Sequence, residues 1–139
     1  MSIGLALGPL FAQVLLVFIL MLWMAKERQT AIRRGEVHFR DIALREPKWP
    51  PRALQVANSF SNQFEIPVLF YVVTILALQT KQIDFLFLIL SWVFVALRYF
   101  HALIHTTSNR VPRRGLVYGL GVLIVMVLWI KVALQIYLL

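Results

Sequence analysis

The sequence predicts an all-α integral membrane protein that forms a bundle of four transmembrane helices. Hydrophobic residues make up 60% of the chain and charged residues only 14%, whereas a soluble domain needs more polar residues to cover its surface. The charges are clustered, so four long apolar segments lie between them. A bilayer core about 30 Å thick requires roughly 20 apolar residues in a helix, and each segment is long enough.

The first segment carries no charge from Ile3 to Ala25. Residues 53–80, 85–109 and 115–139 each contain one formal charge, namely Glu65, Arg98 and Lys131 in turn. Helices are expected because lipid offers no partners to backbone N–H and C=O groups, and the segments lack the alternation of barrel strands. We predict a single domain over residues 1–139. Its expected spans are residues 3–34, 51–80, 85–108 and 112–139.

Prolines mark the connections and one site inside the second span. Pro47, Pro50 and Pro51 disfavour helix in the first connection, and Pro51 suits the first turn of the second helix. Pro112 is expected to open the fourth helix. Pro67 lies inside the second span, where we expect it to kink the helix.

The net charge of +8 indicates membrane topology rather than nucleic-acid binding. Residues 26–52 carry eight basic and four acidic side chains, and residues 106–114 add three arginines. Basic connections remain in the cytoplasm, so both termini and the short connection of residues 80–84 are expected outside it. We expect membrane lipids as partners, because anionic headgroups attract basic connections. Compactness and the lack of retention signals favour a bacterial inner membrane.

Two polar stripes are predicted inside the membrane. They are Asn58, Asn62 and Glu65 on the second helix, spaced i, i+4 and i+7, and Arg98, His101 and His105 on the third, spaced i, i+3 and i+7. Glu65 and Arg98 each lie roughly 18–20 Å from the basic connections. Because an unpaired charge in a span costs at least about 2.5 kcal/mol, we expect these two to pair.

Three roles fit these residues. The first is a helix clamp, in which Glu65 pairs with Arg98 and the other side chains supply interhelical hydrogen bonds. The second is a zinc site formed by His101, His105 and Glu65, although two histidines on one helix recur often by chance and no metal is favoured. The third is a pocket for a small anionic ligand, with a basic mouth formed by Arg110, Arg113 and Arg114.

The chain resembles the MAPEG family, the membrane-associated proteins of eicosanoid and glutathione metabolism, over essentially its whole length. The stretch Asn62-Gln-Phe-Glu65-Ile-Pro67 is similar to the family's N-x-x-E-x-P motif in the second helix. The prostaglandin E synthase branch has a spacing of residues in the third helix that recurs in this chain except at His105. The matching residues are Arg98, His101, Arg110, Pro112 and Arg114.

The resemblance implies a homotrimer that binds glutathione at the subunit interface and acts on a lipophilic small molecule. The thiolate of glutathione would be stabilised by Arg114, with Arg113 as the alternative. Glutathione brings the sulfur, so the absence of cysteine is no objection. The implied cofactor-binding residues are Asn58, Asn62, Glu65, Arg98, His101, His105 and Arg28.

Some positions depart from the family pattern. Asn58 stands where glutathione-using members have an arginine, which would bind a carboxylate, and Arg28 could supply a compensating charge. His105 and Ile66 stand in place of tyrosines, and Gly115 in place of a serine. The leading expectation is a glutathione-dependent transferase or peroxidase for a lipophilic electrophile. The alternative is a non-catalytic lipid- or amphiphile-binding protein of the same fold.

Overall fold

Four helical segments long and apolar enough to cross a membrane form the protein, as the sequence predicts. The structure, a computed structural model, describes residues 2–44 and 48–138. The candidate spans are Ile3–Arg33, Pro51–Gln79, Phe85–Thr106 and Val111–Leu138. The first, third and fourth are the continuous helices α1, α4 and α5. The second consists of α2 (Pro51–Ser61), a 3₁₀ turn η2 (Asn62–Phe64) and α3 (Ile66–Gln79).

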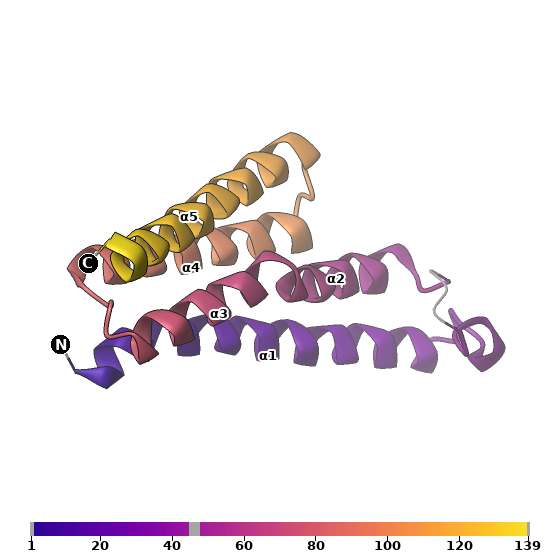
Figure 1. The fold of residues 1–139 in the computed structure, drawn as a ribbon. Coiled ribbons are helices and arrows are strands. Elements are labelled where there is room, and N and C mark those ends of the chain that lie inside the picture. Colours follow the sequence, from indigo (N-terminus) through magenta and orange to yellow (C-terminus); the bar gives the residue numbers. More distant parts are fainter. Residues whose placement is uncertain (1, 45–47, 139) are drawn as a thin grey trace.

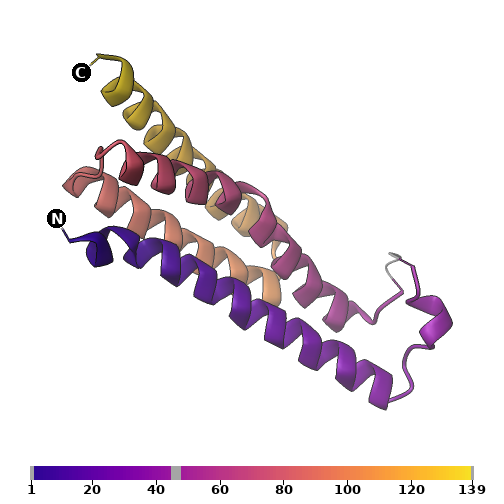
Figure 2. The same cartoon turned by 60° about the horizontal axis from the view of Figure 1, so that its bottom comes forward.

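The spans pack side by side as a bundle (Figure 1). Helix α1 contacts α2 and α4, while α5 contacts α4 and α3. Both termini and the 80–84 connection lie at one end of the bundle, and residues 34–44 and 107–110 lie at the other (Figures 1 and 2). We call the latter the basic end. There α1 and α2 extend past the α4–α5 connection, with the short 3₁₀ helix η1 (Phe39–Asp41) between them.

Local sequence signals define several helix ends. Asp84 caps α4 by accepting the Phe87 backbone N–H at 2.8 Å. After α1 the chain turns at Gly35, whose φ of +68° is unstrained only for glycine. Asn109, with φ of +48°, ends α4 in the same way, and its N–H donates to the Ile104 carbonyl. Pro47, which we expected to disfavour helix in the first connection, lies outside the described residues.

The second span is broken at Pro67 rather than merely kinked. In a continuous helix the Pro67 ring would clash with the Gln63 carbonyl. The chain instead forms the turn η2, Glu65 takes φ −96° and ψ −111°, and α3 restarts with Pro67 in its first turn. The predicted single polar stripe on the second span is therefore wrong, because its three members do not share one continuous helix.

Two buried glutamines hold α1 against this break. Gln13 Nε2 donates to Gln63 Oε1 at 3.0 Å, and Gln63 Nε2 donates to the Ser59 carbonyl at 3.0 Å. Both glutamines are fully buried. Because lipid gives helices no hydrophobic reason to associate, such interhelical hydrogen bonds and close packing stabilise the bundle. The pair fixes the backbone next to Asn62.

A packed apolar core joins α3, α4 and α5 in the half of the bundle nearer the termini. Phe70 and Phe94 are fully buried, and their ring centroids are 4.7 Å apart. The other core residues are Val73, Ala77, Phe87, Val95, Val125, Leu128 and Val132. Apart from Ser91, the buried polar side chains of α4 lie in the half nearer the basic end, from Arg98 to Thr106.

Lys131, in the C-terminal part of α5, forms an ion pair at the end of the bundle that carries the termini. Its Nζ lies 2.7 Å from Asp84 Oδ2 and donates to Gln135 Oε1 at 2.8 Å. Burial alone would raise the pKa of Asp84, but hydrogen bonds from Lys131 and the Phe87 N–H outweigh it and hold that pKa below its ordinary value. Asp84 in the 80–84 connection thus neutralises Lys131.

Candidate functional site

A cavity of about 380 Å³ lies between the broken second span, α4 and α5, near the basic end. This volume falls in the range of about 300–1,000 Å³ that is usual for small-molecule sites. Most of the predicted site residues meet here, although they come from three separate spans. The lining residues are Asn62, Glu65, His101, His105, Arg114, Gly115 and Tyr118. We call this space the Glu65 cavity.

Asn62 links Arg98 to Glu65 beside the cavity. Arg98 Nη2 donates to Asn62 Oδ1 at 2.5 Å and to the Asn62 carbonyl at 3.4 Å, while Asn62 Nδ2 donates to Glu65 Oε2 at 2.9 Å. Arg98 is only 2% exposed, so Asn62 provides acceptors that its guanidinium requires. The direct Glu65–Arg98 ion pair expected from their depth is not formed, because the amide stands between the two charges.

Tyr118 on α5 completes this network, and the sequence-based prediction misses it. Its hydroxyl donates to Glu65 Oε2 at 3.1 Å. Its ring centroid lies 5.7 Å from that of His101 and 5.9 Å from the guanidinium carbon of Arg98. A signal does exist in the sequence, because Tyr118 follows Arg114 by four residues and therefore shares its helix face.

The two hydrogen bonds to Glu65 use the same carboxylate oxygen. Oε2 accepts from both Asn62 and Tyr118, whereas Oε1 has no partner among the described residues. The Nδ1 atoms of His101 and His105 also lack partners in the part of the chain that the structure describes. Both imidazoles are buried, with 2% and 7% exposure. The lining therefore retains one carboxylate oxygen and two imidazoles with unused hydrogen-bonding capacity.

Arg114 is oriented by the turn between α4 and α5. Its Nη1 donates to Asn109 Oδ1 at 2.6 Å, and Asn109 is the residue whose left-handed conformation ends α4. Arg114 is half-buried and lines the cavity, whereas Arg113 is exposed and does not. Of the two arginines predicted for the thiolate role, the structure thus brings Arg114 to the other site residues.

Asn58 and Arg28 line a different cavity of about 600 Å³, between α1, α2 and the first connection. The Arg28 guanidinium carbon lies 4.9 Å from the centroid of the Trp49 ring. Its Nε is buried and has no partner among the residues that the structure describes. Within one chain, these two predicted site residues are therefore separate from the Glu65 cavity.

The zinc alternative gains no support from the geometry. The rings of His101 and His105 stand edge to face, with centroids 5.5 Å apart. Over residues 2–44 and 48–138, no three His, Cys, Asp or Glu side chains come together as a group that could hold a metal ion. The arrangement is suited instead to hydrogen bonding with an organic ligand that carries charges of both signs.

Comparison with known protein families gives a match over nearly the whole chain. A model of the MAPEG family matches residues 6–134, a region that includes every residue lining the Glu65 cavity. The curated proteins and the solved structures give no match to the chain. The match covers nearly the whole chain, and the four spans and the N-x-x-E-x-P motif agree with it. The chain belongs to the MAPEG family, and this membership implies a general role in glutathione-linked lipid metabolism at the membrane.

Proposed function

We propose that the protein is a glutathione transferase or peroxidase that acts on a lipophilic electrophile reaching the cavity from the bilayer. The observation that carries this proposal is the unpaired Glu65 Oε1 in a cavity also lined by two imidazoles and Arg114. Glutathione carries an ammonium group, carboxylates, amides and a thiol. It therefore requires acidic, basic and hydrogen-bonding side chains close together, as this cavity provides.

Each lining residue has a defined role in this proposal. Glu65 Oε1 binds the ammonium group, while Asn62 and Tyr118 hold the other carboxylate oxygen. His101 and His105 donate hydrogen bonds to the peptide part of the ligand. Arg114 stabilises the thiolate, because a guanidinium lowers the pKa of a neighbouring thiol. Bound glutathione would supply the sulfur nucleophile, which the chain lacks because it contains no cysteine.

We propose a homotrimer in which a neighbouring copy completes this site. Glu65 is exposed on the surface of a single chain although it lies within a span. A carboxylate facing lipid costs at least about 2.5 kcal/mol, and a second copy over this face would remove that cost. If the neighbour presents its α1–α2 face, its Arg28 and Asn58 would approach the cavity and could bind a carboxylate. Native mass spectrometry should show three copies, and a monomer would contradict the proposal.

We further propose that the basic end faces the cytoplasm of a bacterial cell and that both termini lie outside it. The basic connections support this orientation. Because the chain has no cysteine, single cysteines introduced at Lys81 and Ser108 can report on it directly. A membrane-impermeant maleimide should label the Lys81→Cys protein in intact cells and leave the Ser108→Cys protein unlabelled. The reverse pattern would mean the opposite orientation.

The decisive experiment compares two adjacent arginines. Purified protein is mixed with glutathione, the ultraviolet absorbance of the thiolate is followed, and conjugation of chlorodinitrobenzene is then measured. We expect both signals in the wild type and in Arg113→Ala, because that residue does not line the cavity. Both should be lost in Arg114→Ala. If the wild-type signals do not exceed those of Arg114→Ala, the proposed activity is refuted.

One observation favours the alternative of a non-catalytic lipid- or amphiphile-binding protein. Arg114 is the only cation among the described residues that line the cavity, whereas glutathione presents more than one anionic group. A ligand at 100 times its Kd stabilises a protein by about 2.7 kcal/mol, so true glutathione binding should raise the melting temperature. A lipid or amphiphile bound in the cavity that Glu65 and Arg114 line, without any thermal shift in millimolar glutathione, would select this alternative.

A further inference from the structure

Another concave surface lies on the outside of the bundle, between α1 and α4. It is an apolar groove of about 500 Å³ that shares no lining residue with the Glu65 cavity. Helix α1 contributes residues from Leu16 to Trp23 and α4 contributes residues from Ala96 to Thr106. These stretches rise about 10 Å and about 15 Å along their helices. The groove is therefore elongated along the spans and extends toward the basic end.

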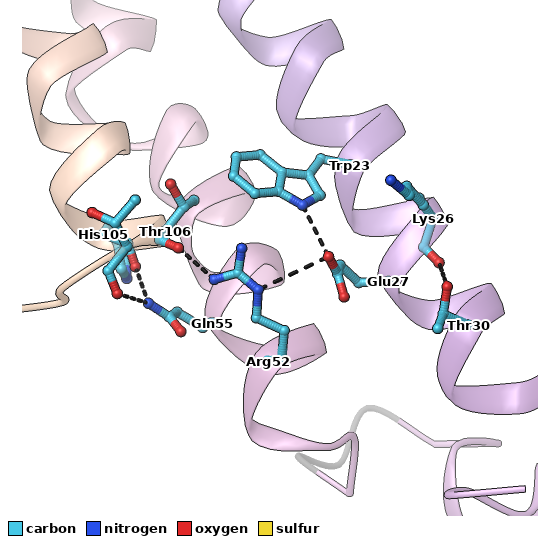
Figure 3. A network of polar contacts seen from close by, with 9 residues as sticks. Trp23, Lys26, Glu27, Thr30, Arg52, Gln55, His105 and Thr106 are labelled. Atoms are coloured by element: carbon cyan, nitrogen blue, oxygen red, sulfur yellow. Dashed lines mark hydrogen bonds and ion pairs between the residues drawn. The ribbon is translucent and has the colours of Figure 1, made fainter. Parts of the chain in front are cut away.

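A cation lies at the basic end of this groove and contacts both of its walls. Arg52 Nη1 donates to the Thr106 carbonyl on α4, and its guanidinium carbon lies 5.2 Å from the centroid of the Trp23 ring on α1. Figure 3 shows the guanidinium between the two helices. Its Nε lies 3.9 Å from Glu27 Oε1, its Nη2 has no partner among the described residues, and the side chain is 45% exposed.

The charge around this end of the groove is positive overall. Glu27 accepts the Trp23 indole N–H at 3.0 Å and compensates Arg52 in part. Lys26 is exposed and follows Ile19 by seven residues, so it lies on the groove side of α1. Two cationic side chains, Arg52 and Lys26, and one carboxylate, Glu27, thus lie at this end of the groove. Their net positive charge favours a ligand with an anionic group there.

We propose that the groove holds one acyl chain of an anionic phospholipid whose phosphate lies against Arg52 and Lys26. In a bilayer the acyl chains occupy the depth of the apolar groove, and the phosphates lie at the interface. Tryptophans such as Trp23 concentrate at that interface, and basic residues there attract anionic lipids. The site thus combines an apolar channel with a cation at the headgroup level. It does not depend on the thiol chemistry proposed above.

The first test compares headgroups. Protein in detergent is exposed to equimolar dioleoyl phosphatidylglycerol and dioleoyl phosphatidylcholine, and the lipid retained per protomer is measured by native mass spectrometry. We expect one retained lipid, mainly phosphatidylglycerol. Arg52→Gln should lower its preference over phosphatidylcholine about fivefold, whereas Glu27→Gln should raise it. Arg33→Gln is the matched control, because it removes an exposed arginine that neither lines nor contacts the groove.

The second test fills the groove. Ala96 lines it and is exposed, so Ala96→Phe should occupy the space without disturbing the buried core. Retention of both lipids should fall. Val93→Phe is the matched control, because Val93 is 41% exposed on α4 and lies outside the lining. Thermal unfolding of each variant shows whether the fold is kept.

Four results would overturn the proposal. Equal retention of the two lipids by the wild type would exclude the headgroup contact, and unchanged retention in Ala96→Phe would exclude the groove. Displacement of phosphatidylglycerol by equimolar oleate would assign the site to free fatty acids. A changed oligomeric mass in Ala96→Phe would identify an interface between copies of the chain. None of these readouts involves glutathione, so they are independent of the proposed function.

Discussion

Replacement of Asn62 by leucine tests whether the amide, rather than Glu65, is the direct partner of Arg98. Arg98 Nη2 makes both of its hydrogen bonds to Asn62, one to the side chain at 2.5 Å and one to the backbone at 3.4 Å. Leucine has a similar size but offers no side-chain acceptor. Because Arg98 is only 2% exposed, Asn62→Leu leaves a buried guanidinium with only its longer backbone contact.

The expected magnitudes follow from this geometry. Removal of one partner from a buried charge costs about 3–5 kcal/mol, and we expect about 3 kcal/mol for Asn62→Leu because the backbone acceptor remains. Arg98→Met removes the short charge-assisted hydrogen bond to the Asn62 side chain and the longer one to its backbone, and should cost about 1.5–3 kcal/mol. The double variant leaves no guanidinium without a partner. Its loss of unfolding free energy should therefore be about 2 kcal/mol smaller than the sum of the losses of the two single variants. Glu65→Gln keeps an acceptor and should cost less than about 1 kcal/mol.

Unfolding by sodium dodecyl sulfate in mixed micelles, followed by far-ultraviolet circular dichroism, measures these free energies. A thermodynamic cycle through Asn62→Leu, Arg98→Met and the double variant gives the coupling between the two side chains. The cycle through Glu65→Gln and Arg98→Met is the matched control. If the Glu65 cycle shows the larger coupling, the two charges pair directly in the folded protein, and Asn62 is refuted as the direct partner of Arg98.

Three further predictions concern side chains around the bundle. Gln13→Leu should cost about 1–3 kcal/mol in thermal unfolding, because it leaves the buried Gln63 Oε1 without its donor; Gln13→Leu with Gln63→Leu should recover most of the loss, and additive losses would contradict the contact. Asn109→Gly keeps the left-handed turn but removes the contact to Arg114, so stability should change by less than about 0.5 kcal/mol while glutathione affinity falls; an unchanged affinity would exclude a positioning role. Asp84→Asn should cost about 0.2–1 kcal/mol at neutral pH, since its ion pair is solvent-screened. The lowered pKa of Asp84 means that this difference is present above the ordinary aspartate pKa of about 3.9 and lost as the pH falls through the folded value. Unfolding at several pH values measures it, and a pH-independent difference would exclude the ion pair.

The four spans are predictable because lipid imposes a simple length requirement and tolerates few charges. The break in the second span is less accessible to sequence reasoning. Pro67 indicates that the helix is disturbed there, but a kink and a restart are both compatible with its ring geometry. In the structure the backbone at the break is held by a contact from another helix, the bond from Gln13 to Gln63. A partner that lies 50 residues away in the sequence leaves no local signal.

The same limit explains the errors at the site. Depth along a helix axis shows which residues are neighbours across a bundle, and it brings Arg98 and Glu65 correctly to one region. It does not show which atoms meet, and in the folded chain the Asn62 amide lies between them. Lys131 is a parallel case, because its partner Asp84 belongs to a connection whose own charges appear balanced in the sequence. Tyr118 is missed because an aromatic residue in a span ordinarily packs or lies at the interface.

The amide link is consistent with the proposal that this cluster binds a ligand and does not serve packing alone. A clamp would place the two opposite charges in contact, because each then compensates the other after desolvation. Direct contact with Arg98 would, however, neutralise Glu65 and occupy its oxygens. Instead, Asn62 and Tyr118 both donate to Oε2, so the Glu65 carboxyl group is oriented while Oε1 has no partner among the described residues. A carboxylate kept in this state inside a span is costly unless a cationic group completes it, and the ammonium of a bound peptide would do so.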